Sequence, residues 1–283
     1  MRALVTGGVG FVGTNLIKRL LSDGHEVISF DNYSTGFKKN EQDGCKYLNF
    51  DVSQKFDFED NIDVIFHMAA LARIQPSINN PSKTLRNNFE STLNILDYAR
   101  LHDIPVIYAG SSSKHHGLYG SPYAWSKYSG EQLCKLYSDV YGLNTSICRF
   151  YNVYGPHHIR SGTYATVLGI FERQYLNNEP LTITGDGEQR RDFTHIDDIV
   201  DGLMRCVGKE HRAEEFELGS GVNYSINEIA NLFNCKTKYI PARPGEYDVT
   251  LCDYTKAKKE LGYEPKGNIQ TYIKKWLEEN KWK

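Results

Sequence analysis

The sequence predicts an α/β protein, with a doubly wound parallel sheet followed by a smaller, discontinuous C-terminal α/β lobe. Three observations lead to this prediction. β-rich runs alternate with helical patterns through the first half of the chain, a glycine-rich turn joins the first run to the first helix, and the alternation weakens after about Tyr151. Strands that alternate with helices pair in parallel through right-handed crossovers.

Six β-rich runs in the first half are typical of buried parallel strands. They are Arg2–Val5, Glu26–Phe30, Tyr47–Phe50, Val64–His67, Val106–Ala109 and Thr145–Arg149. Helical patterns lie between them at Phe11–Ser22, Ser82–Leu101 and Tyr123–Tyr141. We expect residues 1–152 to form this first domain.

The smaller lobe is expected to comprise residues 153–191 and 221–283. A helical pattern at Tyr164–Leu176 and a strand around Lys238–Ile240 are its clearest elements. The run Phe216-Glu-Leu-Gly is typical of a further strand, so the segment near 192–220 is expected to return to the large sheet. The lobe is therefore discontinuous in sequence.

Composition and charge narrow the classes of partner. The 283 residues are 40% hydrophobic and 24% charged, as in ordinary globular proteins. The net charge of −2 gives no reason to expect nucleic acid or an anionic membrane as a partner. The sequence has no apolar run that could span a bilayer, no signal-peptide pattern, and no C-x-x-C pair among its six cysteines. We expect a cytoplasmic protein with reduced thiols.

The glycine-rich turn predicts a dinucleotide site. Residues 7–13 read Gly-Gly-Val-Gly-Phe-Val-Gly and satisfy G-x-G-x-x-G. Glycines allow a tight turn and a close approach of backbone to a pyrophosphate, and the helix N-terminus supplies free N–H groups. The fold is therefore expected to be Rossmann-type. The cofactor contacts expected from this turn are Gly7, Gly10, Phe11, Val12 and Gly13.

Acidic residues after the second and third strands favour NAD as the cofactor. Asp31 follows the glycines by about twenty residues, where a carboxylate accepts the ribose hydroxyls of NAD and repels the 2′-phosphate of NADP. Asn32 adjoins it. Asp51 and Val52 are expected beside the adenine, although a simple turn also explains Asp51. Lys38 and Lys39 leave NADP open as an alternative.

Tyr123 and Lys127 have the spacing of an acid–base couple. They lie four residues apart at the start of a predicted helix and so share one face. We expect Lys127 to bind the nicotinamide ribose and to lower the pKa of Tyr123. Tyr123 could then take a hydroxyl proton while hydride leaves the same carbon. When this motif occurs alone, the alternative is that the two residues are simply exposed on the surface of a helix.

Further motifs accompany the pair in a characteristic order. His67-Met-Ala-Ala70, Asn88 and Ser111-Ser-Ser113 precede it, and Arg149–Pro156, Gly185–Phe193 and Arg243–Glu246 follow it. With the glycine-rich turn, these motifs make essentially the whole chain resemble the extended short-chain dehydrogenases/reductases. Within that superfamily the chain is most similar to the nucleotide-sugar epimerase/dehydratase branch, and there to UDP-hexose 4-epimerases.

The resemblance implies a role for each matching residue. Ser113, Tyr123 and Lys127 would be catalytic, and Ala69, Ala70 and Asn88 would belong to the cofactor site with Tyr123 and Lys127. Asn152, Arg191, Arg243 and Glu246 would bind the nucleotide sugar, since an arginine fork suits phosphate oxygens. The helices at 82–101 and 123–141 match those that pair in dimeric relatives, which implies a homodimer.

Two departures from the family pattern concern the segment after the serines. Dehydratases of this branch carry an Asp-Glu pair after the catalytic Ser or Thr, whereas Lys114 and His115 follow Ser113 here. This disfavours dehydration. The segment from Lys114 to Pro122 is also shorter than in relatives, so we expect a trimmed pocket. The pair His115-His116 lacks further ligands at metal spacing, and we expect no metal.

Three functions remain open from the sequence. The first is NAD-dependent C4 epimerisation of a UDP-hexose or UDP-N-acetylhexosamine through a 4-keto sugar. The second is reduction or oxidation of a nucleotide-bound keto sugar, in which the cofactor exchanges at every turnover. The third is a catalytically idle NAD-binding protein, against which the intact proton-transfer residues argue.

Overall fold

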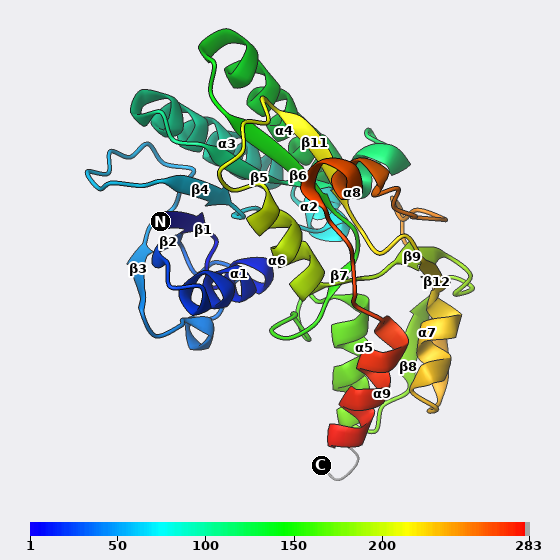
Figure 1. The fold of residues 1–283 in the computed structure, drawn as a ribbon. Coiled ribbons are helices and arrows are strands. Elements are labelled where there is room, and N and C mark those ends of the chain that lie inside the picture. The colour runs from blue at the N-terminus through cyan, green and yellow to red at the C-terminus, as the bar shows by residue number, and fades with distance from the viewer. Residues whose placement is uncertain (281–283) are drawn as a thin grey trace.

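The computed structural model describes residues 1–280, except for the side chain of His116 (Figure 1). Its centre is a seven-stranded sheet in the order β11-β6-β5-β4-β1-β2-β3, with every neighbouring pair parallel. The strands are β1 (Arg2–Thr6), β2 (Glu26–Asp31), β3 (Cys45–Asn49), β4 (Val64–His67), β5 (Val106–Ser111), β6 (Thr145–Phe150) and β11 (Glu214–Leu218).

Helices cover both faces of this sheet (Figure 1). On one face α1 (Phe11–Ser22) packs beside α6 (Ile196–Arg205), and both bury leucines and isoleucines against β1 and β4. On the other face the long helices α3 (Pro81–His102) and α4 (Pro122–Tyr141) lie side by side over β4, β5 and β6. The sheet is buried on both sides, as the continuous apolar runs predict.

The strand order reverses between β1 and β4. β1 has β2 on one side and β4 on the other, so the connections after β1 and β4 leave the sheet in opposite directions. Such a switch point opens a crevice at the carboxyl ends of the strands, where doubly wound proteins bind ligands.

The smaller lobe has its own core, formed around Phe171, Ile229 and Trp276. It projects from one end of the large sheet (Figure 1). The short elements outside the large sheet and its four covering helices are η1 (Lys38–Asn40), α2 (Ile74–Asn79), η2 (Ser112–His116), β7 (Val153–Tyr154), α5 (Val167–Leu176), β8 (Leu181–Thr184), β9 (Arg190–Asp192), β10 (Thr194–His195), β12 (Asn223–Ser225), α7 (Ile226–Leu232), β13 (Thr237–Ile240), α8 (Thr255–Leu261) and α9 (Ile269–Asn280).

The observed elements agree with the predicted fold class, and two differences have clear causes. The helix expected from Tyr164 begins at Val167, because the Thr166 side chain accepts from the Gly169 N–H and caps it there. Helix α8, expected in the smaller lobe, instead packs Ala257 and Leu261 into the core of the large sheet beside α6 and β11. The division at 152, 192 and 220 otherwise stays a prediction.

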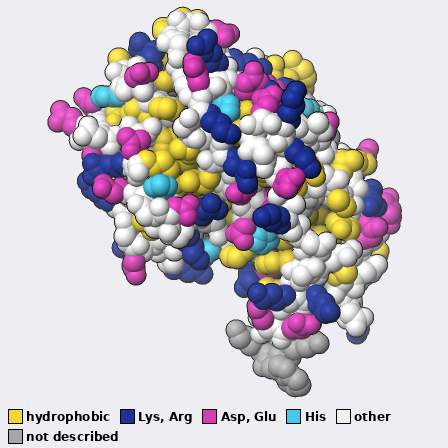
Figure 2. All heavy atoms as spheres, viewed as in Figure 1, with side chains coloured by type: hydrophobic (Ala, Val, Ile, Leu, Met, Phe, Trp, Pro, Cys, Tyr) yellow, Lys and Arg dark blue, Asp and Glu magenta, His cyan; other side chains and the backbone are white. Residues whose placement is uncertain are grey.

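The surface and the helix lengths add two further observations. Figure 2 shows basic and acidic side chains interspersed over the visible face. Within residues 1–280, no helix is both long and apolar enough to cross a membrane.

Candidate active site

A single continuous cavity of about 480 Å³ lies at the switch point. The glycine turn after β1 lines it, together with the segments that follow β4, β5 and β6. Residues of the smaller lobe complete it, among them Thr166, Thr184 and Arg191. Both domains therefore contribute walls to one site.

The glycine turn is too tightly packed to accept side chains. A Cβ on Gly13 would lie 2.1 Å from the carbonyl oxygen of Gly7, and one on Gly7, whose φ is +73°, would lie 2.9 Å from the Ala69 Cα. Gly10 caps α1 without any side-chain acceptor, so the first N–H groups of the helix remain available at the cavity. This arrangement fits a dinucleotide pyrophosphate.

Asp31 lies at the end of β2, and its carboxylate is already anchored by backbone. It accepts from the Val9 N–H at 3.0 Å and the Tyr33 N–H at 2.8 Å. Burial raises its pKa, and these two bonds oppose that shift. Each carboxylate oxygen retains a lone pair for a ribose hydroxyl.

The adenine-side residues form a small polar cluster. Asn32 donates to Asp51 at 3.0 Å, and Ser53 donates to Asp51 from both its backbone and its hydroxyl. Burial raises the pKa of Asp51, but these three bonds outweigh it and the net shift is downward. Val52 is buried in the core beneath, and its carbonyl accepts from the Asn94 side chain at 3.1 Å.

Tyr123 is placed at the cavity by the N-terminus of α4. Ser121 caps the helix by accepting from the Ala124 N–H, and Pro122 occupies the first helical turn. The Tyr123 hydroxyl donates to the Ser111 Oγ at 3.5 Å. Burial raises the pKa of Tyr123, whereas the Ser111 bond and the positive charge of Arg73 lower it.

Lys127 lies one helical turn beyond Tyr123 and is almost completely buried. Its Nζ lies 4.2 Å from the centroid of the Tyr108 ring, and burial lowers its pKa to about 8. The positive charge that lowers the pKa of Tyr123 in this structure is that of Arg73, not that of Lys127. The role expected for Lys127 stays a prediction.

Comparison with known proteins identifies the family. The model of the family described as "NAD dependent epimerase/dehydratase family" matches residues 3–219, which is well over half of the chain. The chain belongs to the NAD dependent epimerase/dehydratase family.

Three relatives illustrate the range of the family near this chain. A putative UDP-glucose 4-epimerase of Methanocaldococcus jannaschii is 32% identical over 98% of both chains. The solved UDP-glucose 4-epimerase of Thermotoga maritima, in complex with UDP-glucose, has a TM-score of 0.90 and 27% identity, covering 98% of each chain. The UDP-glucuronic acid 4-epimerase of Bacillus cereus, solved with UDP-glucuronic acid and NAD, has a TM-score of 0.87 and 25% identity, covering 99% of each chain.

The structure places Ser111, and not Ser113, beside the hydroxyl of Tyr123. Ser113 lies one turn further on, in η2, where its Oγ and its backbone N–H both donate to the Ser111 Oγ, at 2.9 and 3.2 Å. The order of the three serines in sequence does not show which one faces the helix. The family's catalytic hydroxyl is therefore matched better by Ser111, with Ser113 as its hydrogen-bond donor.

This correction moves the dehydratase positions as well. The two residues after Ser111 are Ser112 and Ser113, and neither can act as a carboxylic acid. Lys114 and His115 do not line the cavity; Lys114 forms an ion pair with Glu215 of β11, and His115 forms a hydrogen bond with Glu217 at 2.8 Å. Acids are therefore absent after Ser111 as well as after Ser113.

These contacts belong to a larger charged network behind the serines. The almost inaccessible Arg149 contacts Glu131, Glu215 and Glu217 at 2.7 to 2.8 Å. Glu217 also accepts from the hydroxyl of Tyr151, which lines the cavity. The short segment after Ser113 is thus fixed to β6 and β11 by charge. Among the described residues, there is no group of three possible metal ligands.

The residues expected to bind the nucleotide sugar all line the cavity, namely Asn152, Arg191, Arg243 and Glu246. Asn152 donates to the Asp192 carbonyl and to Thr250 Oγ1, both at 3.1 Å, which leaves its oxygen for a ligand. Arg191 donates to the carbonyl of Arg190. Burial lowers the pKa of Arg191, and the charge of Glu246 opposes this shift.

The residues expected at the cofactor site after β4 differ in their placement. Ala70 lines the cavity, and the Ala69 N–H donates to Thr6 Oγ1 at 3.1 Å. Asn88, however, is buried and does not line the cavity. Its side chain accepts from the Leu71 N–H, donates to the Leu71 carbonyl and donates to the Ser126 hydroxyl. It braces this segment rather than contacting a ligand.

Arg73 and Gln75 also line the cavity, although neither was predicted from the sequence. Arg73 lies just before α2 and Gln75 lies within it. Gln75 donates to the Pro244 carbonyl at 2.8 Å and so connects this segment to the one that carries Arg243. Neither residue belongs to a periodic hydrophobic pattern or to a recognised motif. Only the family segment that begins at His67 could have directed attention to them.

Proposed function

We propose that this protein is an NAD-dependent epimerase that inverts C4 of a UDP-linked sugar. The observation that carries the proposal is the juxtaposition of Tyr123 and Ser111 in one cavity with the glycine turn on one side and Arg191 on the other. A redox couple and an acid–base couple must meet at one hydroxyl-bearing carbon for this reaction.

The residues that hold each ligand follow from their chemistry. The N-terminus of α1 would bind the NAD pyrophosphate, and Asp31 its ribose hydroxyls. Arg191 and Arg243 would bind the diphosphate of the substrate, and Glu246 its ribose. Bound NAD supplies a hydride acceptor that later returns the hydride.

The acid–base steps belong to the chain's own residues. Tyr123 would remove the proton from the C4 hydroxyl as a base and return it as an acid after the sugar has turned over. Ser111 would hold the reacting oxygen by donating a hydrogen bond to it, while Ser113 donates to Ser111. Lys127 would bind the nicotinamide ribose from the same face of α4.

Dehydration and decarboxylation are less well supported. The first requires acids after the catalytic hydroxyl, and Ser112 and Ser113 occupy those positions. Oxidation or reduction with cofactor exchange remains the second candidate, because it needs the same couple.

A proton NMR time course separates these candidates. Full-length protein with UDP-glucose, UDP-glucuronate or UDP-N-acetylglucosamine should produce the C4 epimer of at least one of them, at constant absorbance at 340 nm. Stoichiometric formation of NADH would support the dehydrogenase, and no change with any of the three sugars would overturn the proposed function.

We further propose that the protein is a homodimer formed by α3 and α4. Four large hydrophobic side chains of this pair are at least half exposed, namely Leu101 (70%), Leu136 (50%), Val140 (60%) and Tyr141 (54%). Burial of such a surface stabilises a two-fold interface. Light scattering should give a dimer for the wild type and a monomer for Leu136→Glu/Val140→Glu; a wild-type monomer would contradict this.

The cytoplasmic location stays a prediction.

A further inference from the structure

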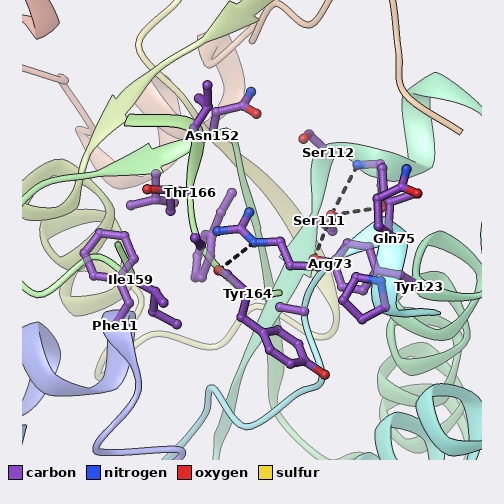
Figure 3. A pocket seen from close by; sticks show the side chains of 18 of the residues that line it. Phe11, Arg73, Gln75, Ser111, Ser112, Tyr123, Asn152, Ile159, Tyr164 and Thr166 are labelled. Carbon is purple, nitrogen blue, oxygen red and sulfur yellow. Dashed lines mark hydrogen bonds between the residues drawn. The ribbon is translucent and has the colours of Figure 1, made fainter. Parts of the chain in front are cut away.

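Arg73 brings a positive charge into the middle of the cavity. It precedes α2, and Figure 3 shows its side chain reaching between Tyr123 and Ser111 on one side and Thr166 and Ile159 on the other. Its Nε donates to the Tyr164 carbonyl at 3.1 Å, which fixes the orientation of the guanidinium. Both terminal nitrogens remain for a ligand.

No carboxylate among residues 1–280 forms an ion pair with Arg73. Two other cations at or near the cavity lie beside carboxylates: Arg149 contacts three glutamates, and the charge of Glu246 acts on Arg191. Burial lowers the pKa of Arg73, and within residues 1–280 the charge of Tyr123 opposes this shift. A desolvated cation without an acidic partner is costly, so an anionic ligand is expected to provide one.

The location of Arg73 indicates which part of the ligand carries this anion. Figure 3 shows Arg73 in the same cavity as Tyr123 and Ser111, the groups proposed to act on C4, and its charge lowers the pKa of Tyr123. The anion therefore belongs to the reacting sugar, close to C4. In a hexose, C6 is attached to C5, the direct neighbour of C4.

The other anions of the two ligands have their own binding groups. The open N-terminus of α1 suits the cofactor diphosphate, and Arg191 with Arg243 suits the substrate diphosphate. A third anion is needed to pair with Arg73. The relatives described above were solved with UDP-glucose and with UDP-glucuronic acid, so the family includes both a neutral and an acidic C6.

We propose that Arg73 receives the C6 carboxylate of a UDP-linked uronic acid, which makes an acidic sugar the preferred substrate of this protein. The two terminal nitrogens of the guanidinium match the two carboxylate oxygens. The inference rests on the proposed function only in placing a nucleotide sugar in this cavity.

Calorimetric titration of the NAD-loaded full-length protein tests this inference without requiring turnover. Wild-type protein should bind UDP-glucuronate more tightly than UDP-glucose. Arg73→Met should weaken UDP-glucuronate binding by about 10- to 100-fold, the usual range for a charge-assisted hydrogen bond, and UDP-glucose binding by less than about 3-fold. Arg73→Lys, which keeps the charge but not the fork, should fall between the two.

Matched measurements exclude the other roles of this cation. Arg19→Met removes an exposed arginine at the far end of α1 and should change neither affinity. An equal loss of affinity for both sugars in Arg73→Met would overturn the inference and indicate that Arg73 acts on Tyr123 instead. A loss of affinity for NAD alone would assign Arg73 to the cofactor. A selective loss without any C4 inversion would leave the inference standing and refute the proposed function instead.

Discussion

The two ends of the cavity are built in different ways. At the cofactor end, the contacts expected for the pyrophosphate come from one short stretch, residues 7–13, and from backbone N–H groups and missing side chains. At the substrate end, they come from side chains such as Arg73, Ser111, Asn152 and Arg243, which are far apart in sequence and meet only in the folded chain.

This difference determines how each end responds to mutation. A backbone site depends on the space between main-chain atoms, so added atoms disturb it. A side-chain site depends on single functional groups, so deleting one group removes one function and leaves the fold intact. The following substitutions test this contrast, in order of decreasing expected effect.

Replacing Tyr123 with Phe removes one oxygen at the substrate end. We expect kcat for C4 inversion to fall by about 10²- to 10⁴-fold, because general acid–base catalysis contributes that much. The affinity for NAD and the melting temperature should change little. Tyr128→Phe, on the same helix, is the matched control and should retain activity; if the two variants were equally active, Tyr123 would not be the acid–base group.

The corrected serine assignment predicts unequal effects within one turn. Ser111→Ala should lower kcat by about 10- to 100-fold, since it removes a hydrogen bond to an oxygen that becomes charged. Ser113→Ala should lower it by less than about 5-fold, because Ser113 acts only through Ser111. Steady-state kinetics on both variants decides the matter, and the reverse order would restore Ser113 as the catalytic hydroxyl.

At the cofactor end, Gly13→Ala adds a single methyl group. Because its Cβ would lie 2.1 Å from the Gly7 carbonyl oxygen, the turn must shift. Overpacking of this kind costs about 1–3 kcal/mol, which we expect as a lower melting temperature together with weaker NAD binding. Gly24→Asn, in an open turn, is the control. Unchanged NAD affinity in Gly13→Ala would show that the tight turn is not needed for the cofactor.

The buried Lys127 predicts a small, pH-dependent effect. Burial lowers its pKa from 10.5 to about 8, so between these values the unfolded chain binds one more proton than the folded protein. The stability of the wild type should therefore rise with pH in this window relative to Lys127→Met, by at most about 1.4 kcal/mol per pH unit. Urea denaturation from pH 7 to 10 measures the free energy of unfolding of both proteins. A difference between them that does not change with pH would contradict the lowered pKa of Lys127.

The same contrast explains what the sequence could predict. The glycine turn and the strands at Arg2–Thr6 and Val64–His67 follow from local pattern, and their positions were predicted almost to the residue. The sequence does not decide between Ser111 and Ser113, because adjacent serines differ only in the direction that the fold gives them. Arg73 was missed because its partners, Tyr164 and Tyr123, are distant in sequence.

Deuterium transfer tests the central claim most directly. UDP-sugar deuterated at C4, incubated with the protein and excess unlabelled NAD, should give both C4 epimers with the deuterium retained at C4 by NMR. Retention shows that hydride leaves and returns within one bound complex. Appearance of the deuterium in the free cofactor pool, or inversion with loss of the label to solvent, would contradict the account.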